Sequence, residues 1–118
     1  MIFQTLFRNR PELRKIAAER IVPIQGDLVV DGCGINPDVR ALLVEDLDII
    51  INSAASVSFN EVMRDALQIN YFGSLRVLAL AKECKKLEVL CHVSTAYVNA
   101  NMPSKTYCPE KMFDRYDG

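Results

Sequence analysis

Residues 47–59, "LDIIINSAASVSF", decide the fold class of this chain. The three consecutive isoleucines at 49–51 are typical of a strand that is covered on both faces, as in a parallel sheet. The strand is expected to extend over residues 47–55 and to end in the small side chains of Ala54 and Ala55. These alanines let either a flat ligand or the following helix come close to the strand end, and we favour the ligand.

Strand and helix patterns alternate on both sides of this segment. A strand is expected over residues 20–28, "RIVPIQGDL", and it should lie at a sheet edge because Pro23 cannot donate a ladder hydrogen bond. A further strand is expected over residues 87–98, "LEVLCHVSTAYV". Helices are expected over residues 11–20, 36–46 and about 60–86. This alternation predicts βαβ units and a Rossmann-like, doubly wound parallel sheet.

Two helix starts carry recognisable capping signals. Asn36 followed by Pro37 is a typical cap and first helical residue. Ser58 and Glu61 have the spacing of a capping box at the start of the long helix. One apolar stripe then runs along that helix at steps of three and four residues and consists of Val62, Ala66, Ile69, Gly73, Val77, Leu80 and Cys84.

The composition indicates one ordinary globular domain over residues 1–118, with 50% apolar and 25% charged residues. The 14 basic and 15 acidic residues give no charge bias toward nucleic acid or an anionic membrane. The four cysteines form no CxxC pair and have no metal-ligand spacing, so no metal site is predicted. Cys84 and Cys91 fall within apolar segments, which favours buried free thiols in a reduced, intracellular protein. No apolar stretch approaches the roughly 18 residues that a membrane span needs.

The three expected strands all end in small or polar residues: Gly26–Asp27, Asn52 through Ala55, and Ser94–Thr95. Ligands of such sheets bind at the carboxyl ends of the strands, so these residues are expected to line one edge. Asn70 lies on the long helix where a buried amide needs partners. It either pins a neighbouring strand or holds a water near the reaction centre, or it is a satisfied core amide. His92, the only histidine, is expected to be a buried strand residue.

Three segments resemble the reductase domain of fatty acyl-CoA reductases, which belong to the extended short-chain dehydrogenase/reductase superfamily. They are "PIQGDL", "NSAASVSFNEVMRDALQINYFGSLRVLALAKE" and "VLCHVSTAYVN", within residues 20–100. The resemblance implies lipid metabolism, with NADPH as cofactor and a fatty acyl-CoA as substrate. It also implies a peroxisomal or endoplasmic reticulum membrane location, with membrane attachment through parts outside this segment. If the location implied by the resemblance does not apply, a cytoplasmic location is expected.

The resemblance also assigns roles to individual residues. Asp27 and Leu28 would flank the adenine, and Ser53, Ala54 and Ala55 would line the ribose and diphosphate. Thr95 matches the active-site hydroxyl, with Ser94 as the alternative, because side chains alternate along a strand and only one of the two can face the site.

Two elements of such enzymes are not found in this sequence. The first is the glycine-rich phosphate loop that binds the dinucleotide. The glycine cluster "DGCG" at 31–34 does not join a strand directly to a helix, so it does not match the pattern of that loop. Tyr107 and Lys111 have the spacing of the superfamily's Tyr-x-x-x-Lys pair, but Pro109 between them breaks a shared helix face. We therefore expect an incomplete sheet without its first two strands, which leaves a gap of about 14 Å beside strand 47–55.

Three functions are consistent with these patterns. The first is NADPH-dependent reduction of a long-chain acyl-CoA to aldehyde or alcohol. The second is another extended short-chain reductase, such as a nucleotide-sugar epimerase or a sterol dehydrogenase. The third is an inert fragment that acts only as a binding module. We expect the third for the isolated chain and the first for the product of the gene from which it comes.

Overall fold

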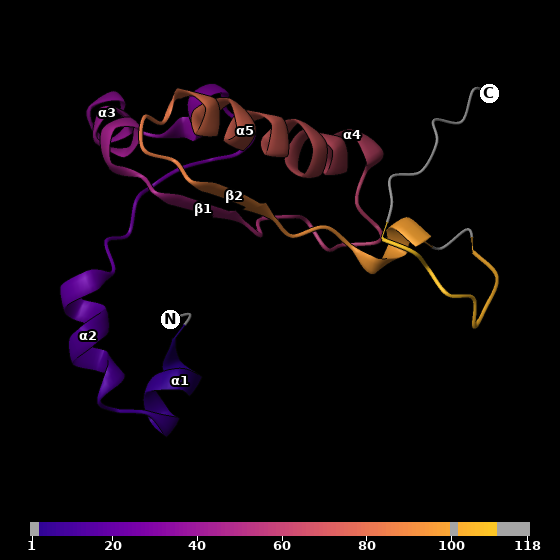
Figure 1. The fold of residues 1–118 in the computed structure, drawn as a ribbon, viewed down its shortest axis with the longest axis horizontal. Helices are drawn as coiled ribbons and strands as arrows, with labels where there is room; N and C mark the ends of the chain where they lie inside the picture. The colour runs from indigo at the N-terminus through magenta and orange to yellow at the C-terminus, as the bar shows by residue number, and fades with distance from the viewer. Residues whose placement is uncertain (1–2, 100–101, 111–118) are drawn as a thin grey trace.

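A computed structural model describes residues 3–99 and 102–110 of this mixed α/β chain (Figure 1). Helices α1 (Gln4–Asn9) and α2 (Leu13–Arg20) are followed by a segment without regular secondary structure, and then by the short 3₁₀ turn η1 (Asp31–Gly34). Helix α3 (Pro37–Asp46) leads into strand β1 (Ile49–Asn52). A long helix composed of α4 (Met63–Ala66), the π-helical turn η2 (Leu67–Phe72) and α5 (Gly73–Glu83) precedes strand β2 (Val89–His92) and the 3₁₀ turn η3 (Ala96–Asn99).

The sheet consists of β1 and β2, which pair in parallel. The register places Ile49 beside Val89 and Asn52 beside His92, and the Val93 N–H donates to the Asn52 carbonyl at 2.9 Å just beyond the strands. Parallel pairing through an intervening helix confirms the βαβ unit predicted for this part of the chain. Both strands are shorter than predicted, because the chain leaves the sheet directly after Asn52 and His92.

The predicted strand over residues 20–28 is wrong. Residues 21–27 have no regular secondary structure, and no strand among the described residues pairs with them. The Asp27 N–H instead donates to the Cys33 carbonyl at 2.7 Å, so the end of this segment is held by its own loop. A strand needs a neighbouring ladder, and the described chain places none beside this segment.

The prediction that both faces of β1 are covered is also wrong for the described residues. Figure 1 shows α3, α4 and α5 on one side of the strands, while α1 and α2 lie away from the sheet. Ile50 and Asn52 point toward the helices, whereas Ile49 and Ile51 point to the opposite face and are 57% and 68% exposed.

The helix predictions are partly confirmed. Asn36 caps α3, since its side-chain oxygen accepts from the Asp38 N–H at 2.9 Å, and Pro37 is the first helical residue. The long helix exists over residues 63–83, but the Ser58–Glu61 capping box is wrong. The helix begins after Val62, which makes no side-chain capping bond.

The buried core is small for a chain of this length. Among the described side chains, only Cys33, Asn52, Leu80 and Ala81 are less than 9% exposed. The radius of gyration is 17.9 Å, against about 13.5 Å for a compact domain of 118 residues. The described elements therefore bury one helix–sheet contact rather than a complete two-sided α/β core.

Candidate functional site

Residues 26–35 form a tight double turn that carries Asp27 and Leu28. The Asp27 carboxylate accepts from the Val29 N–H at 2.9 Å, and the Asp27 carbonyl accepts from the Val30 N–H at 3.2 Å. This is the local pattern by which aspartate closes a turn with its own side chain. Only one carboxylate oxygen takes part, and Asp27 is exposed, so the other oxygen is available to a ligand.

The glycine cluster supplies the second half of this turn. Gly32, Cys33 and Gly34 have φ angles of +66°, +61° and +58°, a backbone region that favours glycine. At Gly34 the need is also steric, because a Cβ atom there would lie 3.0 Å from the Asp27 nitrogen. The cluster therefore fixes the position of Asp27 by close backbone approach.

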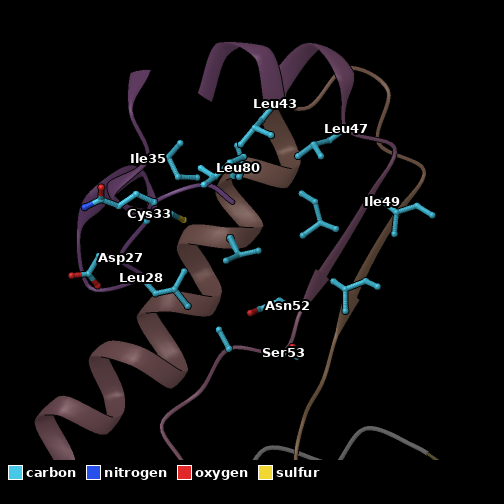
Figure 2. A pocket seen from close by; sticks show the side chains of 17 residues that line it. Asp27, Leu28, Cys33, Ile35, Leu43, Leu47, Ile49, Asn52, Ser53 and Leu80 are labelled. Carbon is cyan, nitrogen blue, oxygen red and sulfur yellow. The ribbon is translucent and has the colours of Figure 1, made fainter. Parts of the chain in front are cut away.

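A cavity of about 500 Å³ separates this turn from β1 (Figure 2). Its lining combines the turn, the edge of β1 and the facing side of α3 and α5, and comprises Ile24, Gln25, Gly26, Asp27, Leu28, Cys33, Ile35, Leu43, Leu47, Ile49, Ile50, Ile51, Asn52, Ser53, Ala54, Val77 and Leu80. Figure 2 shows Asp27 on the side of the turn, Asn52 and Ser53 on the side of β1, and the apolar side chains of Leu43, Leu47 and Leu80 together near α3. Four of the predicted cofactor-binding residues, Asp27, Leu28, Ser53 and Ala54, line this one cavity.

The remaining predicted site residues do not line the cavity. Ala55 lies three residues beyond the end of β1, and Thr95 lies three residues beyond the end of β2. Because the two strands pair in parallel, both residues leave the sheet at the same edge. The Thr95 side-chain oxygen accepts from the Tyr97 N–H at 3.2 Å, and Ser94 is exposed beside it.

Asn70 is exposed rather than buried, and it lies in the π-helical turn η2. Its side chain pairs with the backbone of Ser56 as a second strand would: its oxygen accepts from the Ser56 N–H at 2.8 Å, and its amide donates to the Ser56 carbonyl at 3.1 Å. The amide thus fixes the segment that follows β1. Such π-helical turns are frequent at functional sites.

The buried polar residue of the core is Asn52, which was not singled out as such from the sequence. It is 6% exposed, and its side-chain nitrogen lies 3.1 Å from Nδ1 of His92 and 3.4 Å from the Ser74 hydroxyl oxygen. The expectation of a buried histidine is wrong, since His92 is exposed at the end of β2. The buried Asn52 amide therefore lies beside the exposed His92 ring at the end of β2.

The cysteine expectations need one correction. Cys33 is the buried thiol, whereas Cys84 is half-buried and Cys91 exposed. Burial raises the pKa of the Cys33 thiol, and the guanidinium groups of Arg40 and Arg76 partly oppose this shift. The four cysteines are free.

Tyr107 is 84% exposed and lies outside any helix, and Lys111 lies outside the described residues. No group of three or more histidine, cysteine or acidic residues that could hold a metal ion occurs among residues 3–99 and 102–110. Within the same ranges, no helix has the length and apolar character needed to cross a membrane.

The sequence is similar to known NAD-binding reductases. A sequence profile of the NAD-binding family described as "Male sterility protein" matches residues 2–116. Fatty acyl-CoA reductase 8 of Arabidopsis thaliana is 40% identical over 103 residues, which cover 86% of this chain and 20% of that protein. Two further Arabidopsis thaliana proteins are similar: probable fatty acyl-CoA reductase 5 is 39% identical over 115 residues (95% and 23%), and fatty acyl-CoA reductase 1 is 41% identical over 105 (86% and 21%). The chain spans about a fifth of the length of these curated relatives.

Proposed function

This chain belongs to the fatty acyl-CoA reductase family of NAD-binding domains, and on that premise we propose that it supplies the adenosine-binding rim and the carbonyl-polarising hydroxyl of an NADPH-dependent fatty acyl-CoA reductase. The observation that carries the proposal is the single cavity lined by Asp27, Leu28, Ser53 and Ala54, which belong to two segments far apart in sequence.

The predicted cofactor-binding residues of the cavity fit the adenosine half of a dinucleotide. A carboxylate with one uncommitted oxygen accepts a hydrogen bond from the exocyclic amine of adenine, and the adjacent Leu28 offers an apolar surface to the ring. Ser53 and Ala54 are exposed and small, so ribose can approach the backbone there. These are the positions that the family resemblance assigns to the cofactor.

The apolar part of the cavity near α3 does not fit a nucleotide. Leu43, Leu47 and Leu80 provide no hydrogen-bond donor for phosphate or ribose. This part of the cavity borders the open edge of β1 and is suited to apolar side chains. We therefore place the nucleotide at the rim only.

When bound, NADPH supplies the hydride that reduces the acyl carbon of the thioester. The electron pair of the carbonyl double bond would move to oxygen, which takes up a proton to give the hemithioacetal. The hemithioacetal would then lose its hydroxyl proton and the CoA thiolate, together the free thiol, to give the aldehyde. A second NADPH and one further proton would reduce the aldehyde to the alcohol. Thr95 stabilises the charge that develops on the carbonyl oxygen. Its oxygen accepts from the Tyr97 N–H, which leaves its O–H free to donate to substrate.

The test uses fatty acyl-CoA reductase 8 of Arabidopsis thaliana in which residues 20–100 of this chain replace the aligned segment. In this grafted reductase, the relative supplies all of the chain outside the replaced segment. It is expected to form fatty alcohol or aldehyde from palmitoyl-CoA with NADPH, and to show no turnover of a nucleotide sugar. Product is measured by chromatography and NADPH oxidation by absorbance.

Substitution at the strand end tests the role of Thr95 in the same protein. Thr95→Ala is expected to lower kcat about 100- to 1000-fold, because one donor to the developing oxyanion is lost. Thr95→Ser should retain most of the rate, and Ser94→Ala is the matched control. An unchanged rate in Thr95→Ala excludes this assignment, and a loss confined to Ser94→Ala transfers the role to Ser94.

The isolated 118-residue chain is proposed to be inert. Its small buried core and its open sheet face leave little to hold the rim in place. We expect neither measurable NADPH binding nor acyl-CoA reduction by this chain alone. Tight NADPH binding in titration calorimetry contradicts this expectation.

A further inference from the structure

Two residues of α5 hold the turn that carries Asp27 and Leu28. The Arg76 side chain, which is 20% exposed, donates from Nη1 to the Leu28 carbonyl at 3.0 Å and from Nε to the Asp31 carboxylate at 3.2 Å. One helical turn earlier, Gly73 lies so close to Leu28 that a Cβ atom there would be 3.0 Å from the Leu28 Cβ. Helix α5 thus positions the turn in two ways: Gly73 lets Leu28 approach closely, and Arg76 donates a hydrogen bond to the Leu28 carbonyl.

The bond to Leu28 is the important one of the two that Arg76 makes. The Asp31 side chain is 99% exposed, and an ion pair with such a partner contributes little because water screens it. The bond to the Leu28 carbonyl is charge-assisted and half-buried, which makes it stronger than a neutral hydrogen bond. The planar guanidinium reaches both partners at once, which a lysine ammonium on a flexible stem does not reproduce.

We propose that Arg76 is a positioning residue for the adenosine half of the cofactor. By holding the Leu28 carbonyl on α5, it sets where the Leu28 side chain and the Asp27 carboxylate lie at the rim of the cavity. Arg76 does not line the cavity and needs no contact with the cofactor itself. The inference rests on the proposed function for its ligand and on the contacts of Leu28 for its geometry.

The first test measures cofactor use by the grafted reductase. Arg76→Met is expected to raise KM for NADPH about tenfold, the effect of losing one charge-assisted hydrogen bond, with kcat unchanged. KM for reduced nicotinamide mononucleotide, which lacks the adenosine half, should not change. Arg76→Lys should behave like Arg76→Met, because it keeps the charge and loses the fork. Arg64→Met, at an exposed position of α4, removes the same charge and should have no effect.

The second test is independent of the cofactor. Hydrogen exchange of the Val29 and Val30 amides, both bonded to Asp27, is compared in the grafted reductase without cofactor, with and without Arg76→Met. We expect faster exchange in this turn while exchange in α3 is unchanged, and no change in Arg64→Met. Unchanged exchange in the turn, or faster exchange throughout the chain, overturns the positioning role.

The two proposals fail in different ways. If the grafted reductase with its original Arg76 does not oxidise NADPH, the proposed function fails, and the exchange experiment still decides whether Arg76 holds the turn. If it does oxidise NADPH but Arg76→Met changes KM for both nucleotides equally, or for neither, the positioning role fails and the proposed function stands.

Discussion

Replacing Gly73 with alanine sets two effects of similar size against each other. Gly73 begins α5 with an ordinary helical φ of −58°, so helix propensity alone favours alanine by about 1 kcal/mol. The added Cβ, however, would lie 3.0 Å from the Leu28 Cβ and 3.5 Å from its carbonyl oxygen. Carbon atoms pack best at about 3.5–4.0 Å, so one side must move by several tenths of an ångström.

The steric cost is expected to exceed the gain. Leu28 cannot move freely, because its carbonyl is bonded to Arg76 and the preceding Asp27 N–H is bonded to the Cys33 carbonyl. Overpacking against a fixed neighbour costs about 1–3 kcal/mol. The net effect of Gly73→Ala is therefore a local destabilisation of about 1 kcal/mol rather than a stabilisation of the same size.

Native-state hydrogen exchange of the α5 amides in the grafted reductase measures this local free energy without requiring two-state unfolding. We expect exchange to become about fivefold faster, the equivalent of about 1 kcal/mol. Ala79→Gly, at an exposed position of the same helix, calibrates the propensity effect alone.

A double variant identifies the cause. Leu28→Gly removes the Leu28 Cβ, the atom that a Cβ at position 73 would contact. Adding Gly73→Ala to Leu28→Gly should therefore stabilise α5 through the higher helix propensity of alanine, relative to Leu28→Gly alone. Leu28→Ala keeps that atom, so adding Gly73→Ala to it should not. Slower exchange of α5 in Gly73→Ala by itself refutes the argument, because it means that the turn moves away at no cost.

Two further outcomes follow from the described contacts. Asn70→Ala removes both hydrogen bonds to the Ser56 backbone, and at about 1 kcal/mol for each bond the Ser56 amide should exchange at least fivefold faster. Asn70→Asp keeps the acceptor for the Ser56 N–H, so its Ser56 amide should lose less protection. Equal exchange rates in the original protein and both variants contradict the pairing. Cys33 should react with iodoacetamide more slowly than the exposed Cys91, as read by mass spectrometry of the alkylated peptides, because burial raises the pKa of its thiol and restricts access. The thiol of unfolded Cys33 ionises from about pH 9, whereas the folded one stays protonated because its pKa is raised. The contribution of Cys33 to stability is therefore complete below pH 9 and is lost as the pH rises beyond it. Above pH 9 the unfolding midpoint should fall more than that of Cys33→Ala, and an equal fall in both proteins contradicts this.

The sequence predicts residues of the candidate site only where they are adjacent in the chain. The sequence predicts Asp27 with Leu28 and Ser53 with Ala54 as cofactor-binding pairs, and the structure brings both pairs to one cavity. Their roles toward a cofactor remain predictions. Arg76 is not predicted as a site residue, because its partner Leu28 lies 48 positions away in the sequence.

The sequence by itself determined the local elements. A cap followed by proline began α3, three isoleucines formed the centre of β1, and a stripe of period 3.6 produced the long helix, because these features depend on neighbours within one or two turns. The tertiary structure decided whether residues 21–27 find a strand partner, which face of β1 is open, and that Arg76 and Gly73 meet Leu28 across 48 and 45 positions of sequence. A strand exists only beside its neighbour and a buried contact only between packed elements, so neither can be read from a short stretch of residues.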